Sequence, residues 1–402
     1  MQKIQRKKEL DKLSVLKNKN LIKVITGVRR CGKSTLLLQF QELLKAENPL
    51  VPVISINLDL PEFRFLAEKN WKEIYDYIQN LLQKNTFNYV FIDEIQNICE
   101  FEKLLESLFV IPDVDLYVTG SNAYLLSSEL ATLLTGRAFE INILPFSFAE
   151  YLEYTGKSAN PDRAFADYMR TGGFPEAVGL VQEGENFAYE YLNTVFQNIY
   201  ENDIRKRHTI YYDTSYKEVV HFLIDSVGST VSAGNIAKVL TANGKKIDNK
   251  TVSKYIHTLV ESYLFYRVNR YDIKGKLHLA TQEKYYLVDL GLRYALLGKE
   301  FSADAGHLLE NVIFLELLRR NEQVWIGKAD NLEVDFVARG NDGYTKYIQV
   351  ALTVKEQKTL ERELAPFAKI PDYNERLLIT MDYEQGSHNG VKQINAIDWI
   401  IK

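Results

Sequence analysis

Residues 25–40 of this chain read ITGVRRCGKSTLLLQF, and this stretch decides the fold around it. A short apolar, β-branched run at residues 21–26 leads into it, which is typical of a buried strand. An apolar stripe with helical spacing covers residues 34–44. The order strand, glycine loop, helix is the setting in which such a loop binds phosphate groups.

The glycine loop itself fits the pattern G-x-x-x-x-G-K-[ST] without a mismatch, through Gly27, Gly32, Lys33 and Ser34. Glycines let the backbone turn tightly and point N–H groups at phosphate oxygens. We expect Lys33 to neutralise the β- and γ-phosphates and Ser34 to ligate Mg²⁺, and we include Thr35 among the nucleotide-binding residues. A glycine turn with an incidental lysine is the alternative, and the strand–loop–helix setting argues against it.

A second motif, NYVFIDEIQNICEF, places Asp93 and Glu94 at the end of an apolar strand. Asp93 is suited to hold Mg²⁺ through water, and Glu94 to polarise the attacking water. The alternative is a solvent-exposed acidic pair at a strand end. A third strand ends in TGSN, where Ser121 or Asn122 is placed to sense the γ-phosphate, unless this is a plain turn. Together these motifs predict an ATP-hydrolysing core.

Composition limits the other classes of protein. The 402 residues carry a net charge of -4, so a globally basic nucleic-acid coat is absent, although a local basic face is not excluded. Two cysteines cannot form a disulfide framework, which fits a reducing cytosol. No apolar run approaches the ~18 residues of a membrane span, and the basic N-terminus has no apolar signal core. We therefore expect a cytoplasmic protein with no membrane contact.

Short apolar runs alternate with helical segments through the first 150 residues, which is the pattern of a parallel α/β sheet. The runs after the glycine loop are Val51–Ile56, Tyr89–Ile92 and Leu116–Thr119, and the pattern ends at Ile143–Leu144. A mostly helical stretch then extends to about residue 212.

The segments GVRRCGKS, FIDEIQ, VTGSN, LTGRAFEINILPFSFAEYL and TGGFPEAV resemble the AAA-superfamily ATPases of the archaeal-ATPase and STAND branch, closely over residues 20–150 and loosely to 212. The resemblance implies ATP rather than GTP. It implies that Arg137 is an arginine finger that completes a neighbouring subunit's site, which would require an oligomer. It also places Pro175 against the adenine. A helix-capping arginine and an ordinary turn are the alternatives. For Arg29 and Arg30 two alternatives stay open: they contact phosphate groups or partner strands, or they lie on the surface in solvent.

Residues 214–298 follow the element order of a winged helix, namely helix, helix, turn, helix and hairpin. The helices are expected at Tyr216–Ser226, Ser232–Leu240 and Asn249–Ser262, and the hairpin in YLFYRVNRYDIKGKLHLA. The basic and polar residues of the last helix and the wing are Asn249, Lys250, Ser253, Lys254, His257, Arg267, Arg270, Lys274 and Lys276. If that helix enters a major groove, these side chains contact DNA. A rigid spacer or a protein-contact module is the alternative.

The last segment, with GHLLENVIFLELLRR, LEVDFVA and YIQVALTV, is similar to the uncharacterised domain that commonly follows such an ATPase, itself similar to PD-(D/E)xK nucleases. By this resemblance Glu310, Asp335 and Gln349 match the helix glutamate, the strand aspartate and the first residue of (E/Q)-x-K, which hold Mg²⁺ in an active nuclease. The lysine position is Ala351, and neither nearby lysine has the two-residue offset from Gln349. We expect a nuclease-like scaffold that has lost cleavage and could still hold DNA or a partner.

The predicted fold class is therefore α/β, a P-loop parallel sheet followed by a helical lid, a winged helix and a nuclease-like α/β domain. The predicted boundaries are 1–20 for an N-terminal helix, 21–150 for the AAA-type core, 151–213 for the lid, 214–298 for the winged helix and 299–402 for the C-terminal domain. The favoured function is a Mg²⁺-dependent ATPase that switches a DNA-contacting state. Its rivals are an ATP-dependent DNA nuclease of a defence-type system and a signalling scaffold that contacts only proteins, whose partners the sequence does not name.

Overall fold

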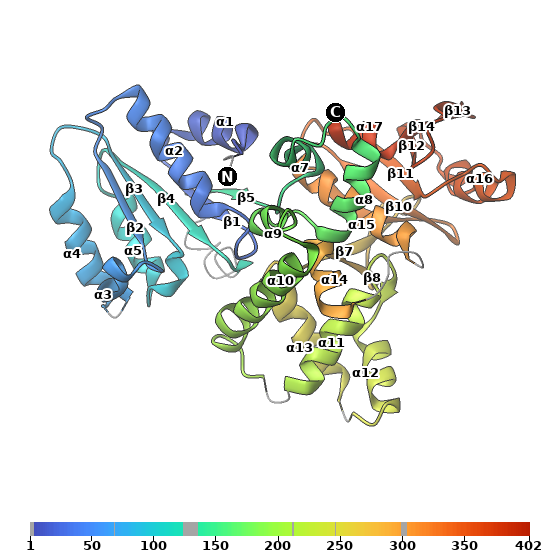
Figure 1. Ribbon diagram of the computed structural model, residues 1–402, viewed down its shortest axis with the longest axis horizontal. Helices are drawn as coiled ribbons and strands as arrows, with labels where there is room; N and C mark the ends of the chain where they lie inside the picture. The colour runs from blue at the N-terminus through green and yellow to red at the C-terminus, as the bar shows by residue number, and fades with distance from the viewer. Residues whose placement is uncertain (1–3, 68, 124–135, 211–212, 246, 299–303) are drawn as a thin grey trace. The chain divides into compact units, whose positions relative to one another are not determined.

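The computed structural model describes residues 4–67, 69–123, 136–210, 213–245, 247–298 and 304–402 (Figure 1). The chain divides into two compact units. The first consists of Met1–Ile143 and Glu261–Tyr263, and the second of Leu144–Val260 and Leu264–Lys402. Within the described residues, no helix is both long enough and apolar enough to cross a bilayer.

The first unit is built on a five-stranded sheet with the order β2-β3-β4-β1-β5, in which every pair is parallel. Its strands are β1 (Ile22–Thr26), β2 (Val53–Asn57), β3 (Asn88–Asp93), β4 (Val114–Gly120) and β5 (Ala138–Asn142). Its helices are α1 (Lys7–Leu16), α2 (Lys33–Glu47), η1 (Pro61–Phe63), α3 (Arg64–Ala67), α4 (Trp71–Leu81), η2 (Ile95–Asn97) and α5 (Phe101–Phe109). Because the strands are parallel, the carboxyl ends of β1, β4 and β3 meet at one edge of the sheet.

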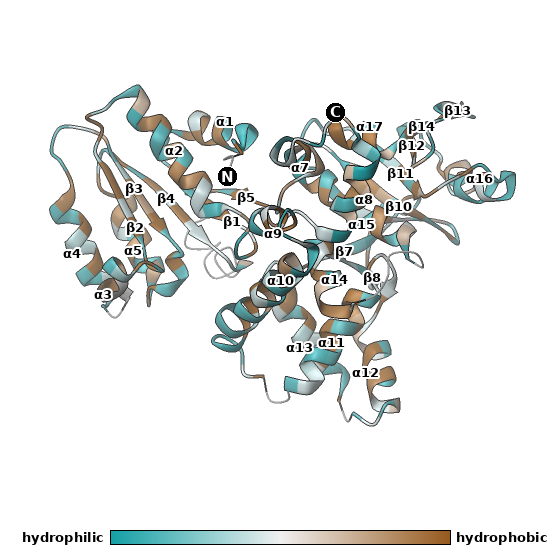
Figure 2. Ribbon diagram, in the orientation of Figure 1, coloured by the Kyte–Doolittle hydropathy of each residue, from teal (hydrophilic) through white to brown (hydrophobic). Residues whose placement is uncertain are grey.

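Helices cover both faces of this sheet (Figure 1). On one face, Phe40 of α2 contacts Phe91 and Tyr117, whose stacked rings lie 4.7 Å apart. On the other face, Ile92 and Val118 belong to a buried cluster with residues of α4 and α5. The strands are mostly hydrophobic, whereas α2 and α4 are hydrophobic over only part of their surface (Figure 2). The predicted α/β fold with a parallel sheet is thus confirmed.

The sequence pattern does not predict β5. It is an edge strand whose side chains are largely outside the core, and only Ile141 is buried. An edge strand needs no continuous apolar run, because one of its sides has no partner strand.

The second unit begins with helices and continues into a mixed sheet. Its helices are α7 (Phe148–Thr155), α8 (Pro161–Thr171), α9 (Pro175–Leu180), α10 (Glu185–Ile199), η4 (Tyr200–Arg205), α11 (Asp213–Asp225), α12 (Ala233–Ala242), α13 (Asn249–Glu261), α14 (Leu290–Leu297), α15 (Ala305–Arg319), α16 (Gln357–Leu364), η5 (Phe367–Lys369) and α17 (Ala396–Ile401). The three helices predicted after residue 214 are thus present as α11, α12 and α13.

A nine-stranded sheet joins the hairpin after α13 to the C-terminal strands, in the order β13-β14-β12-β11-β10-β9-β7-β8-β6. The strands are β6 (Thr230–Val231), β7 (Phe265–Asp272), β8 (Leu277–Leu287), β9 (Gln323–Ala329), β10 (Leu332–Arg339), β11 (Thr345–Ala351), β12 (Glu375–Thr380), β13 (Gly386–His388) and β14 (Val391–Asn395). The joint is a parallel pairing of β7 with β9, in which Arg270 faces Ile326. Residues 214–298 and 299–402 therefore share one sheet, which brings β8 side chains into the C-terminal segment.

Candidate functional site

The glycine loop follows β1 at the carboxyl edge of the first sheet. Gly27 has φ of 141°, and a Cβ added there would lie 2.1 Å from the carbonyl oxygen of Ile143. Gly32 has φ of 105° and is the residue before α2 begins. Both conformations favour glycine, and at Gly27 no side chain fits. The loop backbone is thereby fixed at the N-terminus of α2, whose N–H groups and dipole favour an anion.

Lys33 is the first residue of α2 and is buried. Its ammonium donates hydrogen bonds to the carbonyl oxygens of Gly27 and Val28, at 3.0 and 3.1 Å. It also lies 3.6 Å from Glu94 Oε1. The positive charge is therefore held inside the loop, beside the predicted catalytic carboxylate.

Ser34 and Asp93 come together as the sequence predicts, because the Ser34 side chain hydrogen-bonds the Asp93 carboxylate. Thr119 also donates to Asp93, and the Asn57 amide donates to its Oδ2 at 3.0 Å. Burial raises the pKa of Asp93 above its usual value, against the hydrogen bonds from Ser34 and Thr119. A hydroxyl and a buried carboxylate side by side are the hard oxygen ligands that suit Mg²⁺.

Glu94 follows directly and has the left-handed φ of 55°. Its N–H donates to Thr119 Oγ1 at 2.9 Å, and its carboxylate accepts from Ser121 Oγ at 3.1 Å and from Gln96. Burial alone would raise the pKa of Glu94, but the Lys33 and Arg29 charges lower it below its usual value. The carboxylate is thus ionised, fixed and next to the phosphate-binding loop, which suits a group that orients water.

The end of β4 supplies the remaining polar side chains of this site. Ser121 and Asn122, the two predicted sensor residues, are buried, and Ser121 contacts Glu94 directly. Gln96 is a residue that the sequence analysis misses. Its amide nitrogen contacts both Glu94 and Ser121, while its buried Oε1 has no hydrogen-bond partner among the residues that the structure describes. Thr35 is exposed at the start of α2.

Arg137 lies at the opposite edge of the first sheet. It precedes β5, whose Ala138 faces Ile22 at the amino end of β1, whereas the glycine loop begins after Thr26. The five residues of β1 span roughly 16 Å at about 3.3 Å per residue. The exposed guanidinium lies over the Phe109 ring, 5.6 Å from its centre. Arg137 therefore cannot reach the phosphates of its own chain, and a role in a neighbouring subunit stays a prediction.

Pro175 is the first residue of α9, in the second unit. The Gly173 N–H just before it donates to Asp289 Oδ2 at 2.6 Å, and the Gly291 N–H donates to Oδ1 at 2.9 Å. Burial raises the pKa of Asp289 to about 7 despite these bonds. The segment before Pro175 is thus fixed by a buried carboxyl, and its contact with adenine stays a prediction.

The predicted DNA-contacting residues of α13 share one helix face. Lys250, Lys254 and His257 are exposed at spacings of four and three residues, and Val252 and Ile256 face the core. The basic residues of the predicted wing, by contrast, lie close to acidic side chains or are partly buried. Arg267 lies 3.8 Å from Glu283, Lys274 lies 2.6 Å from Asp330, and Arg270 is half-buried on β7. The available basic face is therefore centred on α13.

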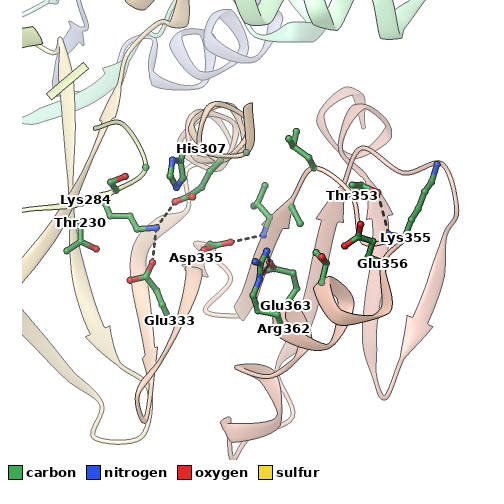
Figure 3. Close-up of a pocket in the computed structure, with 18 residues that line it drawn as sticks. Thr230, Lys284, His307, Glu333, Asp335, Thr353, Lys355, Glu356, Arg362 and Glu363 are labelled. Atoms are coloured by element: carbon green, nitrogen blue, oxygen red, sulfur yellow. Dashed lines mark hydrogen bonds and ion pairs between the residues drawn. The ribbon is translucent and has the colours of Figure 1, made fainter. Parts of the chain in front are cut away.

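The C-terminal segment forms a pocket of about 840 Å³ beside α15, β10 and β11 (Figure 3). Glu310 and Asp335 line it, as does Ala351 at the position of the expected lysine. Gln349 is buried, accepts from the Asp335 N–H at 3.0 Å and donates to Glu363 at 3.0 Å. The three residues that the resemblance assigns to this site are thus near one another.

The pocket also contains a lysine that the sequence analysis misses. Lys284 of β8 is buried, and its ammonium lies 2.9 Å from Glu310 Oε1 and 2.8 Å from Glu333 Oε1. Burial would lower the pKa of Lys284, but Glu310, Asp335 and Glu333 raise it above its usual value. Nothing in the local sequence distinguishes this lysine, because its place depends on the pairing of β7 with β9.

The two lysines nearest Ala351 in the sequence do not replace it. Lys346 is paired with Glu322 at 2.7 Å, and Lys355 lines the pocket from the segment after β11. Among the residues that the structure describes, no group of three or more His, Cys, Asp or Glu side chains has a geometry that could hold a metal ion.

Comparisons with known proteins agree with the class that the first unit defines. Residues 19–152 match a family described as "AAA domain", and residues 162–303 match a domain of unknown function (DUF8612). The N-terminal part is therefore an AAA-type P-loop ATPase domain, the class of protein that binds ATP.

Two relatives extend over most of the chain. An uncharacterized protein of Haemophilus influenzae is 37% identical over 404 residues, which cover 99% of each chain. Uncharacterized protein MJ1544 of Methanocaldococcus jannaschii is 31% identical over 366 residues, or 87% of this chain and 78% of that protein. The chain therefore belongs to one family with these two proteins.

Solved structures resemble the chain more distantly. The Walker-type ATPase paby2304 of Pyrococcus abyssi has a TM-score of 0.49 at 17% identity, over 73% of this chain and 95% of that one. The Orc1 protein of Aeropyrum pernix, in complex with DNA, has a TM-score of 0.31 at 15% identity, over 75% and 94%. At these values neither likeness says anything about ligands or partners.

Proposed function

We propose that this protein is a Mg²⁺-dependent ATPase whose nucleotide cycle controls a DNA-contacting state. The observation that carries the ATPase part is the convergence of Lys33, Ser34, Asp93 and Glu94 at one edge of the first sheet. Four side chains from two separate sequence motifs meet there in the positions that phosphoryl transfer needs.

Each of these residues has one task in the proposed reaction. The Lys33 ammonium leaves its carbonyl partners to neutralise the β- and γ-phosphates. Glu94 orients the attacking water and accepts its proton while the bond between the β–γ bridging oxygen and the γ-phosphorus breaks. Ser34 and Asp93 would hold Mg²⁺, which offsets phosphate charge when bound. Ser121 and Asn122 follow β4 directly, and Ser121 contacts Glu94, so we assign the response to the γ-phosphate to these two residues.

The DNA part of the proposal is carried by the basic face of α13, in a segment with winged-helix element order. Lys250 and Lys254 stand one helical turn apart and are exposed on a chain of net charge -4. Such a local basic face suits phosphate contacts in a groove, since the chain as a whole carries a net negative charge.

Steady-state ATP hydrolysis with and without duplex DNA tests the proposal, with Lys33→Ala as the blank. We expect DNA to stimulate hydrolysis and the double variant Lys250→Ala/Lys254→Ala to lose the stimulation. A matched double variant in the first unit, Lys45→Ala/Lys72→Ala, removes the same charge and should retain it. The slope of DNA affinity against salt should fall by about two in the α13 variant.

The two rival functions correspond to other outcomes. If DNA changes the rate of ATP hydrolysis in none of the proteins tested, the result would favour a nucleotide switch that contacts only proteins. Plasmid cleavage with Mg²⁺ or Mn²⁺ would favour an ATP-dependent nuclease, which the uncharged Ala351 argues against.

A further inference from the structure

Gln96 contacts the predicted catalytic carboxylate through one end of its amide group. It is the middle residue of η2, the single turn that follows Glu94. Its Nε2 donates to Glu94 Oε2 and, at 3.1 Å, to Ser121 Oγ. Its Oε1 is buried and has no hydrogen-bond partner among the residues that the structure describes. One acceptor in this site is therefore placed but unused.

The orientation of this amide follows from the charge of Glu94. Against the effect of burial, the Lys33 and Arg29 charges hold the pKa of Glu94 below its usual value, so its carboxylate is ionised and can only accept hydrogen bonds. The amide nitrogen of Gln96 must therefore face Glu94. Because Nε2 and Oε1 are bonded to the same carbon atom, Oε1 also lies close to this carboxylate.

The turn that carries Gln96 is held in place by packing and by backbone hydrogen bonds. Ile95 and Ile98 are buried in the hydrophobic cluster of the first unit. The Asn97 N–H donates to the Glu94 carbonyl at 3.0 Å, and the Ile98 N–H to the Ile95 carbonyl at 3.0 Å. The left-handed φ of 55° at Glu94 persists only where the surroundings impose it. The unused acceptor is thus fixed relative to Glu94.

A hydrogen-bond donor is needed to satisfy this acceptor, since a buried acceptor without a partner costs free energy. Phosphate oxygens only accept, so the donor that ATP hydrolysis brings to this place is water. The two oxygens of Glu94 also differ. Oε2 accepts from Gln96 and Ser121, whereas Oε1 lies 3.6 Å from the Lys33 ammonium, on the side of the phosphate-binding loop. Glu94 Oε1 and Gln96 Oε1 are therefore two acceptors for the two hydrogens of one water.

We propose that Gln96 is a further catalytic residue, whose Oε1 accepts one hydrogen of the attacking water while Glu94 Oε1 accepts the other. Two acceptors direct the water's lone pairs to the opposite side, toward the γ-phosphorus. As the water oxygen bonds to phosphorus and the bond to the bridging oxygen breaks, the proton on the Glu94 side passes to that carboxylate. The hydrogen on the Gln96 side stays on the product phosphate. This inference deepens the proposed ATPase function and rests on it.

Single-turnover hydrolysis of ATP by the full chain, with Lys33→Ala as the blank, tests the proposal. We expect Gln96→Met, which keeps the length of the side chain without its amide, to slow hydrolysis by about 10²-fold, the order of loss that a misplaced reactant causes. ATP affinity, measured with a fluorescent analogue, should stay within about threefold, because the lost contact is with water and not with nucleotide. Asn97→Met, at an exposed position of the same turn, is the matched control and should change neither quantity.

The same substitution in a Glu94→Gln background separates contact with the water from support of Glu94. If Gln96 contacts the water, Glu94→Gln/Gln96→Met should hydrolyse ATP at least about tenfold more slowly than Glu94→Gln alone. If Gln96 only holds Glu94 in place, the second substitution adds no further loss, and that result overturns the proposal.

An unchanged hydrolysis rate in Gln96→Met also overturns the proposal and leaves the ATPase function intact. An unsubstituted protein that is no faster than Lys33→Ala overturns the proposed function and this inference together. Thermal melting checks that each variant is folded. If Gln96→Met does not fold, Gln96→Ser takes its place in both comparisons, with the same expected losses and the same refuting results.

Discussion

Replacing Glu94 with glutamine is expected to slow ATP hydrolysis and to tighten ATP binding. Glu94 lies 3.6 Å from the Lys33 ammonium and 3.7 Å from an Arg29 guanidinium nitrogen. At an effective dielectric constant of about 20, each pair has a Coulomb energy of about 4–5 kcal/mol. ATP must draw both cations away from Glu94, and its phosphates are repelled by the same carboxylate. After desolvation offsets most of this, we expect a net gain of about 1–2 kcal/mol, roughly five- to thirtyfold in affinity.

Titration with a fluorescent ATP analogue and single-turnover hydrolysis measure the two effects separately. The glutamine oxygen can still accept from Ser121, so the local structure should persist. Hydrolysis should fall by about 10²–10⁴-fold, the usual contribution of a positioned base. Glu100→Gln, an exposed acid of the same segment, is the control and should change neither quantity. A normal turnover rate would remove Glu94 from catalysis, and weaker ATP binding would refute the idea that it holds the two cations.

Three further predictions concern other parts of the chain. Gly27→Ala should abolish ATP binding, because its Cβ would meet a backbone carbonyl at 2.1 Å; Gly156→Ala, with φ of 68° and open space around it, should bind ATP normally in the same titration. Arg137→Ala and Lys33→Ala should each be inactive alone and regain ATPase activity when mixed, since one supplies the loop and the other the arginine; no recovery would argue against a neighbouring-subunit role. The carboxyl of Asp289, with its pKa raised from 3.8 to about 7, stabilises the fold fully below about pH 4, and this stability is lost as pH rises through 7. Urea unfolding should show a loss of about 4 kcal/mol over that window that is missing in Asp289→Asn, from about three pKa units at 1.36 kcal/mol each; an equal slope in both proteins would contradict it.

The first unit was largely predictable because its chemistry is local in sequence. The glycine loop and the acidic pair each occupy a few consecutive residues at strand ends, and the parallel sheet brings those ends together. What the pattern could not supply was Gln96, whose role depends on the turn after Glu94 that directs its amide to both Glu94 and Ser121. An exposed edge strand such as β5 was also missed, because it lacks an apolar run.

The C-terminal pocket shows why motif matching stops short of chemistry when a site is built from distant strands. The sequence comparison asks only whether position 351, two residues after Gln349, is a lysine, and it finds Ala351. The structure nevertheless places a lysine in the pocket. β8 lies in the same nine-stranded sheet, close enough for Lys284 to reach Glu310 and Glu333. A lysine on β8 does not occupy the same place as one at position 351 of β11, since the Lys284 ammonium lies between Glu310 and Glu333. The Lys284 ammonium thus offsets part of the carboxylate charge in the pocket from a strand that the motif does not include.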